Sequence, residues 1–234
     1  AQRREVTEVL DQFTAVYFLD STILSLPATL REVFQGVGGY ASCAALKIQL
    51  LFDYLSGNIS HMSFAAARKT DQAYQDHLPH VQPGNLLIQD LGIFNLRTLQ
   101  AVVDQLAYFL TRWQQGVHVY LASVPDQALD MLSFLRQQGS EGQEYAVLVG
   151  TTAKLPCRMV CVRLPAAVVA QRRRRAKADA KRRGKPITKR KLDLLAWNVF
   201  LTNATAAQLS LRQILVCYSL RWQVELIFKL WKSQ

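Results

Sequence analysis

The sequence Tyr218-Ser-Leu-Arg-Trp-Gln-Val-Glu-Leu-Ile-Phe-Lys-Leu-Trp-Lys232 predicts an amphipathic helix near the end of the chain. Because a helix turns by about 100° per residue, four polar side chains share an arc of about 60°: Tyr218, Arg221, Glu225 and Lys232. The neighbouring arc is apolar: Leu220, Val224, Ile227, Phe228 and Trp231. A carboxylate among cations at the edge of a core is a candidate metal ligand that faces a phosphate-rich substrate. The alternative is an ordinary amphipathic helix with solvated charges.

Two apolar stretches earlier in the chain each end in an aspartate. Ala15-Val-Tyr-Phe-Leu-Asp20 and Asn85-Leu-Leu-Ile-Gln-Asp90 both read as buried strands. Burial of an aspartate is costly unless the carboxylate is paired or coordinates a cation. Asp20 could instead begin a turn, since Asp-Ser-Thr is good turn chemistry. Asp90 is followed by Gly92, and strand ends of this kind are where α/β sheets place their sites.

The remaining pattern predicts an α/β fold with a mixed sheet flanked by helices. Strands over 46–54 and 59–67 form a hairpin, which together with the first strand makes a three-stranded antiparallel unit. A helix over 95–115 then leads to a strand over 117–122 in a parallel crossover. From residue 126 the pattern changes to a β-rich insertion over 126–195, with strands over 145–149 and 158–164 and a helix that opens at Pro165. The sequence therefore divides into a first core segment, 1–125, the insertion, and a closing core segment, 196–234, whose last helix could begin at Ser210.

The positive charge is concentrated in one segment. The formal net charge is +11, and 12 of the 28 basic residues lie within 171–191, opposed only by Asp179. Without this segment, 16 basic and 16 acidic residues remain. Such a block commonly contacts nucleic acid phosphates, so the run Arg172, Arg173, Arg174 and Arg175 is a candidate DNA-binding surface. The alternatives are a solvated basic loop and a patch for an anionic membrane.

Several classes of protein are not supported by the sequence. No apolar run reaches the ~18 residues of a membrane span, and no signal peptide opens the chain, so no membrane contact is expected. The sequence does not suggest a disulfide framework, and the cysteine thiols fit a reducing cytoplasm, so we expect a cytoplasmic protein. The four cysteines show no C-x-x-C pairing, which argues against a zinc site. The stretch Gly36-Val-Gly-Gly39 lacks a Walker lysine, so no nucleotide cofactor is expected. The chain begins without Met and stops just after Lys232, which we interpret as a fragment of a longer protein.

This order of elements and motifs resembles the ribonuclease-H-like catalytic core of DDE transposases, specifically bacterial transposases of the insertion-sequence-four group. Asp20-Ser-Thr is similar to their first acidic motif, and Asp90-Leu-Gly-Ile-Phe is similar to the second. Leu201-Thr-Asn203 resembles the strand before their last helix. The third motif, Tyr-Arg-Glu-Lys, is matched position for position by Tyr218, Arg221, Glu225 and Lys232. The sequence departs from the family at Leu91, where a polar or basic residue is common.

The resemblance implies a transposase that cleaves DNA strands and transfers them in the cut-and-paste movement of an insertion sequence. Asp20, Asp90 and Glu225 would be the catalytic residues and would hold two Mg²⁺ or Mn²⁺ ions, with Asp20 between them. Tyr218, Arg221 and Lys232 would contact DNA. The implied partners are double-stranded DNA, as transposon ends and target, and a second copy of the protein in an active dimer at the bacterial nucleoid. The alternatives are another ribonuclease-H-like nuclease and an inactive or domesticated DNA-binding relic.

Overall fold

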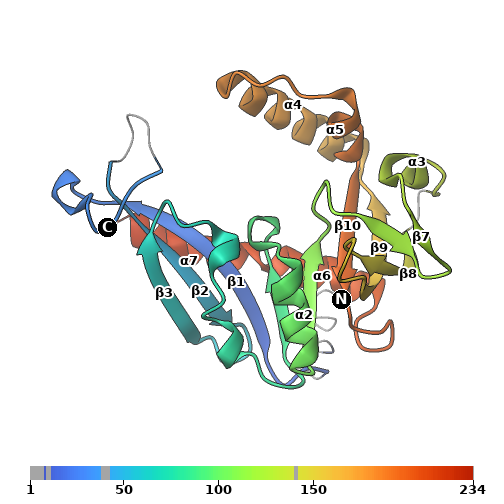
Figure 1. Ribbon diagram of the computed structural model, residues 1–234, viewed down its shortest axis with the longest axis horizontal. Coiled ribbons are helices and arrows are strands. Elements are labelled where there is room, and N and C mark those ends of the chain that lie inside the picture. Colours follow the sequence, from blue (N-terminus) through green and yellow to red (C-terminus); the bar gives the residue numbers. More distant parts are fainter. Residues whose placement is uncertain (1–7, 9–11, 38–42, 140–141, 234) are drawn as a thin grey trace. The chain divides into compact units, whose positions relative to one another are not determined.

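Figure 1 shows the computed structural model of the chain, which describes residue 8 and residues 12–37, 43–139 and 142–233. The chain forms two compact units: Ala1–Thr111 together with Asn203–Gln234, and Arg112–Thr202. Residues 38 and 39 of the glycine-rich stretch 36–39 lie outside the described residues. No helix in the described ranges has the length and apolar character needed to cross a membrane.

The first unit contains a mixed sheet with the strand order β3-β2-β1-β4-β5. The strands are β1 (Val16–Ser25), β2 (Ala45–Asp53), β3 (Ile59–Ala66), β4 (Leu86–Gln89) and β5 (Tyr108–Arg112). β1, β2 and β3 pair in antiparallel fashion, whereas β4 runs parallel to both β1 and β5. This order and these directions confirm the predicted ribonuclease-H-like arrangement, including the hairpin of β2 and β3.

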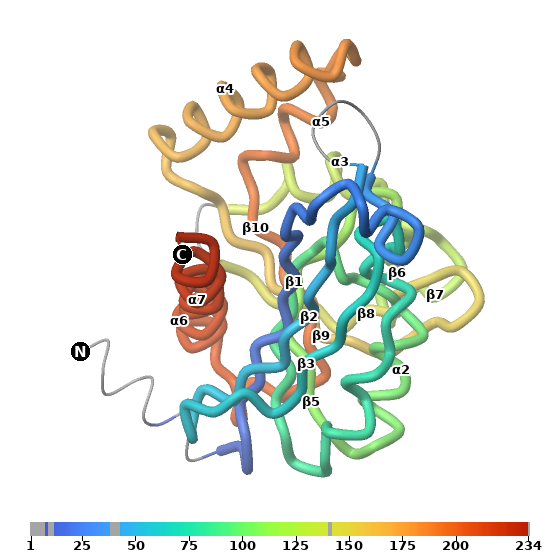
Figure 2. The backbone as a smooth tube through the Cα atoms, turned by 90° about the vertical axis from the view of Figure 1, so that its left-hand side faces the viewer, coloured from blue at the N-terminus to red at the C-terminus, as the bar shows by residue number. Residues whose placement is uncertain are grey.

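Helices cover both faces of this sheet. Figure 2 shows α2 (Leu96–Asp104) on one face and α6 (Leu211–Leu220) with α7 (Trp222–Lys232) on the other. Short 3₁₀ turns complete the unit: η1 (Ala28–Leu30), η2 (Asp71–Ala73), η3 (Leu78–His80) and η4 (Leu91–Ile93). Because both faces are covered, the central strands read as continuous apolar runs, and their fully buried side chains include Phe18, Leu19, Leu87 and Ile88. Each such side chain contributes about 1.5–3 kcal/mol to folding.

The predicted helix over 95–115 is wrong in its second half. α2 ends at Asp104, and β5 occupies Tyr108–Arg112 as the parallel strand of the crossover. The apolar side chains of Phe109 and Leu110 happen to continue the helical spacing, although they belong to a strand. The predicted parallel strand over 117–122 is also wrong, because the short strand β6 (Val119–Leu121) pairs antiparallel with β8 in the second unit.

The second unit is an antiparallel sheet with the strand order β10-β9-β8-β6-β7. Its other strands are β7 (Val124–Ala128), β8 (Gln143–Val149), β9 (Leu155–Arg163) and β10 (Trp197–Thr202), and its helices are α3 (Met131–Arg136), α4 (Ala166–Arg182) and α5 (Lys189–Leu194). The predicted insertion, 126–195, lies inside this unit. The unit includes more residues than the predicted insertion at both ends, because β6 pairs with β8 and β10 pairs with β9.

Candidate active site

Asp20 lies in the middle of β1, on the face of the sheet that α7 covers. The strand continues to Ser25, and Asp20 pairs with Leu50 of β2. The expectation that the strand ends at Asp20 is therefore wrong, because the polar residues after Asp20 stay in the ladder with β2. The Asp20 side chain is only 13% exposed, and its Oδ1 accepts a hydrogen bond from the backbone N–H of Ser21 at 2.8 Å.

Asp90 lies next to Asp20 because of the parallel pairing of β4 with β1. Leu19 pairs with Gln89, so the two aspartates follow paired residues on neighbouring strands. β4 ends at Gln89, and Asp90 precedes the 3₁₀ turn η4. The Asp90 side chain is 41% exposed, and its placement directly after the strand agrees with the sequence-based prediction.

Arg221 and Glu225 come from the closing helices. Ser210 and Gln213 form a capping box at the start of α6, as the sequence allowed. The predicted single helix is interrupted at Arg221, where the N–H of Val224 donates to the Arg221 carbonyl at 3.1 Å in a tighter, i to i+3 bond. α7 then places Glu225 in its first turn.

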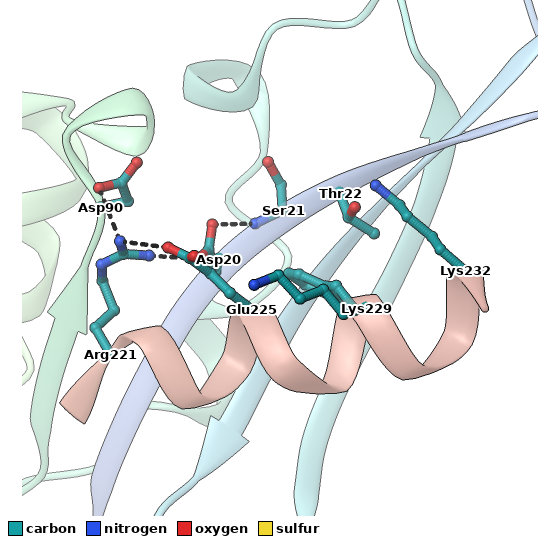
Figure 3. Close-up of a pocket in the computed structure, with 9 residues that line it drawn as sticks. Asp20, Ser21, Thr22, Asp90, Arg221, Glu225, Lys229 and Lys232 are labelled. Atoms are coloured by element: carbon teal, nitrogen blue, oxygen red, sulfur yellow. Dashed lines mark hydrogen bonds and ion pairs between the residues drawn. The ribbon is translucent and has the colours of Figure 1, made fainter. Parts of the chain in front are cut away.

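The guanidinium of Arg221 lies between the three carboxylates (Figure 3). Nη1 is 2.5 Å from Asp20 Oδ2, whereas Nη2 is 3.0 Å from Glu225 Oε1 and 3.6 Å from Asp90 Oδ1. The Arg221 side chain is 14% exposed. The structure thus brings together Asp20, Asp90 and Glu225, which lie far apart in the sequence, around one shared cation.

Burial and charge oppose each other at this site. The pKa of Asp20 is raised to about 6, chiefly by burial of its carboxyl group. The nearby charges of Asp90 and Glu225 also raise this pKa, whereas the Arg221 charge and the hydrogen bond from the Ser21 N–H lower it. Burial disfavours the charge of Arg221, but the surrounding carboxylates still raise the pKa of its guanidinium. The site therefore holds more negative charge than one arginine compensates.

A cavity of about 280 Å³ opens over these side chains. Its lining is Asp20, Ser21, Thr22, Asp90, Arg221, Glu225, Phe228, Lys229 and Lys232. Lys229 and Lys232 extend from α7 on the side of the carboxylates (Figure 3). Lys229 was missed in the sequence, although it follows Glu225 by four residues and so lies on the same helix face. The cavity combines acidic groups at its base with two lysines near its edge.

Two of the predicted DNA-binding groups lie elsewhere. Tyr218 belongs to α6 and is half-buried, with its ring centre 5.9 Å from the guanidinium carbon of Arg221, and it does not line the cavity. The run Arg172–Arg175 lies on α4 of the second unit. Arg172 donates to Asn198 Oδ1, and Arg173 donates to the Leu192 carbonyl and to Asp193 Oδ1. The four arginines are therefore not equivalent.

The donor set of the cavity fits a hard divalent cation. Carboxylate oxygens are the ligands that Mg²⁺ and Mn²⁺ prefer, and three of them already contact one positive group. As the side chains stand, no three acidic, histidine or cysteine side chains in the described ranges enclose a single metal ion. The positive group that lies between the carboxylates is the Arg221 guanidinium.

Comparisons with known proteins give a consistent result. The family model described as Transposase DDE domain matches residues 11–234. A transposase for insertion sequence element IS231F of Bacillus thuringiensis subsp. israelensis is 28% identical over an alignment of 243 positions, which covers 97% of this chain and 51% of that protein. A transposase for insertion sequence element IS231D of Bacillus thuringiensis subsp. finitimus is 30% identical over an alignment of 249 positions, which covers 97% of this chain and 52% of that protein. The chain spans about half the length of these curated relatives.

Among solved structures, a piggyBac transposase synaptic complex with hairpin DNA matches 86% of this chain and 36% of that chain. The sequence identity is 10% and the TM-score is 0.46.

Proposed function

Because the chain belongs to the transposase DDE domain family, we propose that it carries the centre for metal-dependent cleavage and transfer of DNA strands in the transposition of an insertion sequence. The observation that carries the proposal is the meeting of Asp20, Asp90 and Glu225 in one cavity. These residues come from β1, the end of β4 and α7, so only the fold brings them together.

The three carboxylates are the proposed holders of two magnesium or manganese ions. Asp20, the most buried of the three, would lie between the ions, with Asp90 and Glu225 each holding one. Bound ions of this kind activate an attacking water or 3′-hydroxyl and stabilise the leaving oxygen. The low exposure of Asp20 keeps water away from its carboxylate and strengthens its attraction for a cation.

The cations around the cavity are the proposed contacts for the DNA backbone next to the cleaved bond. Arg221 offers a planar fork that suits two phosphate oxygens, whereas Lys229 and Lys232 supply point charges at the edge. Tyr218 would act through its ring beside the Arg221 guanidinium and so help to orient it. The substrate in this proposal is double-stranded DNA, both as transposon end and as target, handled at the bacterial nucleoid by a dimer.

The test is strand cleavage by the full-length protein with Mg²⁺ and an oligonucleotide that carries the transposon end. Asp90→Asn should lower cleavage by at least about a thousandfold, since it removes a ligand charge while keeping the side-chain shape. The matched control is Asp104→Asn at the exposed end of α2, which should cleave as the wild type does. Persistent cleavage by Asp90→Asn would refute the catalytic assignment. Cleavage without joining of the cut end to target DNA would indicate a hydrolytic nuclease instead.

A further inference from the structure

The basic helix α4 has two sides with different roles. Its half-buried side consists of Val169, Arg172, Arg173, Ala176 and Ala180, which recur at the helical spacing of three and four residues. Arg172 and Arg173 use their guanidinium groups to hold β10 and α5, through Asn198 and Asp193. These two arginines therefore attach α4 to the rest of its unit.

An exposed side of α4, next to the half-buried one, presents a narrow line of cations. At about 100° per residue, Arg174, Lys177 and Lys181 fall within an arc of about 60°. All three are exposed. No hydrogen bond or ion pair joins these side chains to another residue of the described ranges, whereas Arg182 pairs with Asp179 at 2.9 Å.

A helix cap brings a fourth cation to this line. Gly184 adopts a positive φ of 62°, its N–H donates to the Lys181 carbonyl, and the N–H of Lys185 donates to the Ala180 carbonyl. This pair of bonds is a Schellman motif, which turns the chain back at the helix end. As a result, Lys177, Lys181 and Lys185 line one open hollow of about 280 Å³, which Gly184, Pro186 and Ile187 help to form.

We propose that Arg174, Lys177, Lys181 and Lys185, the α4 stripe, form a docking surface for the sugar–phosphate backbone of one strand of duplex DNA. The proposal rests on the proposed function, because it assigns part of the substrate contact of that function to the second unit. From Arg174 to Lys181 the helix rises about 10 Å, which equals the rise of about three nucleotides of one strand along the duplex axis, at about 3.4 Å each. The hollow between the three lysines can receive one of these phosphates.

The composition of α4 favours DNA over an anionic membrane. Helices that bind membrane surfaces insert a face of large apolar side chains such as Trp, Phe and Leu. In α4 the only branched apolar residues are Val168 and Val169 in the first turn. Ala170 lies on the line of the stripe, and Gln171 and Ala178 lie beside it. The exposed side of α4 thus offers charge without an apolar anchor.

The test measures the affinity of the full-length protein for duplex DNA by fluorescence anisotropy over a range of salt concentrations. The stripe variant is Lys177→Gln/Lys181→Gln/Lys185→Gln. The matched control removes the same charge from the same segment at exposed positions off the stripe: Arg182→Gln/Lys189→Gln/Lys191→Gln. The stripe variant should bind DNA at least about tenfold more weakly at 0.1 M salt. The magnitude of its negative slope of log K against log salt should fall by about 2–3. The control should change the slope by less than about one.

Three outcomes would overturn the proposal. The salt slope of the stripe variant could be unchanged, or both variants could lose the same affinity for DNA. In a parallel assay with phosphatidylserine vesicles, the stripe variant could lose its binding to the vesicles and keep its binding to DNA. All substituted residues are exposed, so both variants should keep the wild-type fold. Circular dichroism and thermal melting check that they do. Cleavage by the wild type is assayed separately. If the wild type cleaves DNA with Mg²⁺ but the stripe variant keeps the wild-type slope, only the docking surface is wrong. If the wild type does not cleave, the proposed function fails whatever the slope.

Discussion

Arg221 and a metal ion would need the same oxygen atoms. The guanidinium contacts Asp20, Glu225 and, at 3.6 Å, Asp90, all from a position where its side chain is 14% exposed. Two cations that share ligands at short range repel each other strongly where water is scarce. Metal binding should therefore displace Arg221 from the carboxylates, and the released fork is then available to a phosphate of the substrate.

Replacement of Arg221 by glutamine should therefore tighten metal binding while it weakens catalysis. The neutral amide no longer competes for the carboxylates, and we expect Mn²⁺ to bind about tenfold more tightly, a gain of about 1.4 kcal/mol. Cleavage should fall because the phosphate loses its fork. Isothermal titration calorimetry with Mn²⁺ measures the affinity independently of activity.

Arg97→Gln is the matched control for this experiment, since it removes one charge from an exposed position on α2 of the same unit. It should leave the Mn²⁺ affinity unchanged. Weaker Mn²⁺ binding by Arg221→Gln than by the wild type would mean that the guanidinium organises the carboxylates and does not compete with the ion.

At the scale of elements, the end of α2 explains why the helix boundary was predicted wrongly. The N–H of Leu106 donates to the Val103 carbonyl, and the N–H of Ala107 donates to the Val102 carbonyl, which is the Schellman pattern. This motif usually has glycine at the residue with positive φ, but here Leu106 adopts a φ of 59°. Without glycine the sequence carries no stop signal, and the apolar spacing runs on into β5.

Leu106→Gly should stabilise the protein by about 0.5–1 kcal/mol. A leucine in the left-handed region costs about 1–2 kcal/mol, which glycine avoids, although glycine loses more backbone entropy on folding. The loss of the side chain costs little because Leu106 is 74% exposed. Urea unfolding monitored by circular dichroism measures the difference. Leu106→Ala keeps the β-carbon and so should bring no gain. A less stable Leu106→Gly would show that the backbone strain at this cap is negligible.

Local patterns predicted those parts of the fold and site in which the signal lies within one element. The strand of Asp20, the hairpin, the strand before Asp90 and the capping residue Ser210 all carry such signals. The interruption at Arg221 has none, since no glycine or proline marks it, and the Arg221 side chain contacts Asp20 of β1 and Asp90, which lie far away in the sequence. The separate roles of Arg172 and Arg174 likewise depend on which side of α4 meets β10 and α5.

At the scale of the whole molecule, the first unit is discontinuous, since residues 112–202 form the other unit. The chain re-enters the first unit at Asn203, whose side chain bonds to the backbone at the start of β5. Its Oδ1 accepts from the N–H of Phe109 at 2.8 Å, and its Nδ2 donates to the Ala107 carbonyl at 2.9 Å. Gln208 adds a bond from its Nε2 to the hydroxyl of Tyr108 at 2.6 Å. These contacts attach the segment that carries Glu225 to the start of β5, which pairs with β4, the strand that precedes Asp90.

Asn203→Ala should therefore destabilise the first unit by about 1–3 kcal/mol, because the N–H of Phe109 in β5 and the carbonyl of Ala107 just before it lose their bonds to this side chain. The amide of Phe109 should lose protection in hydrogen exchange, while amides in β8 and β9 of the second unit keep theirs. Asn58→Ala, at an exposed turn, is the control and should change stability by less than about 0.5 kcal/mol. If Asn203→Ala leaves the exchange of Phe109 unchanged, the return of the chain does not depend on this side chain. If protection falls equally in β8 and β9, the two units unfold as one.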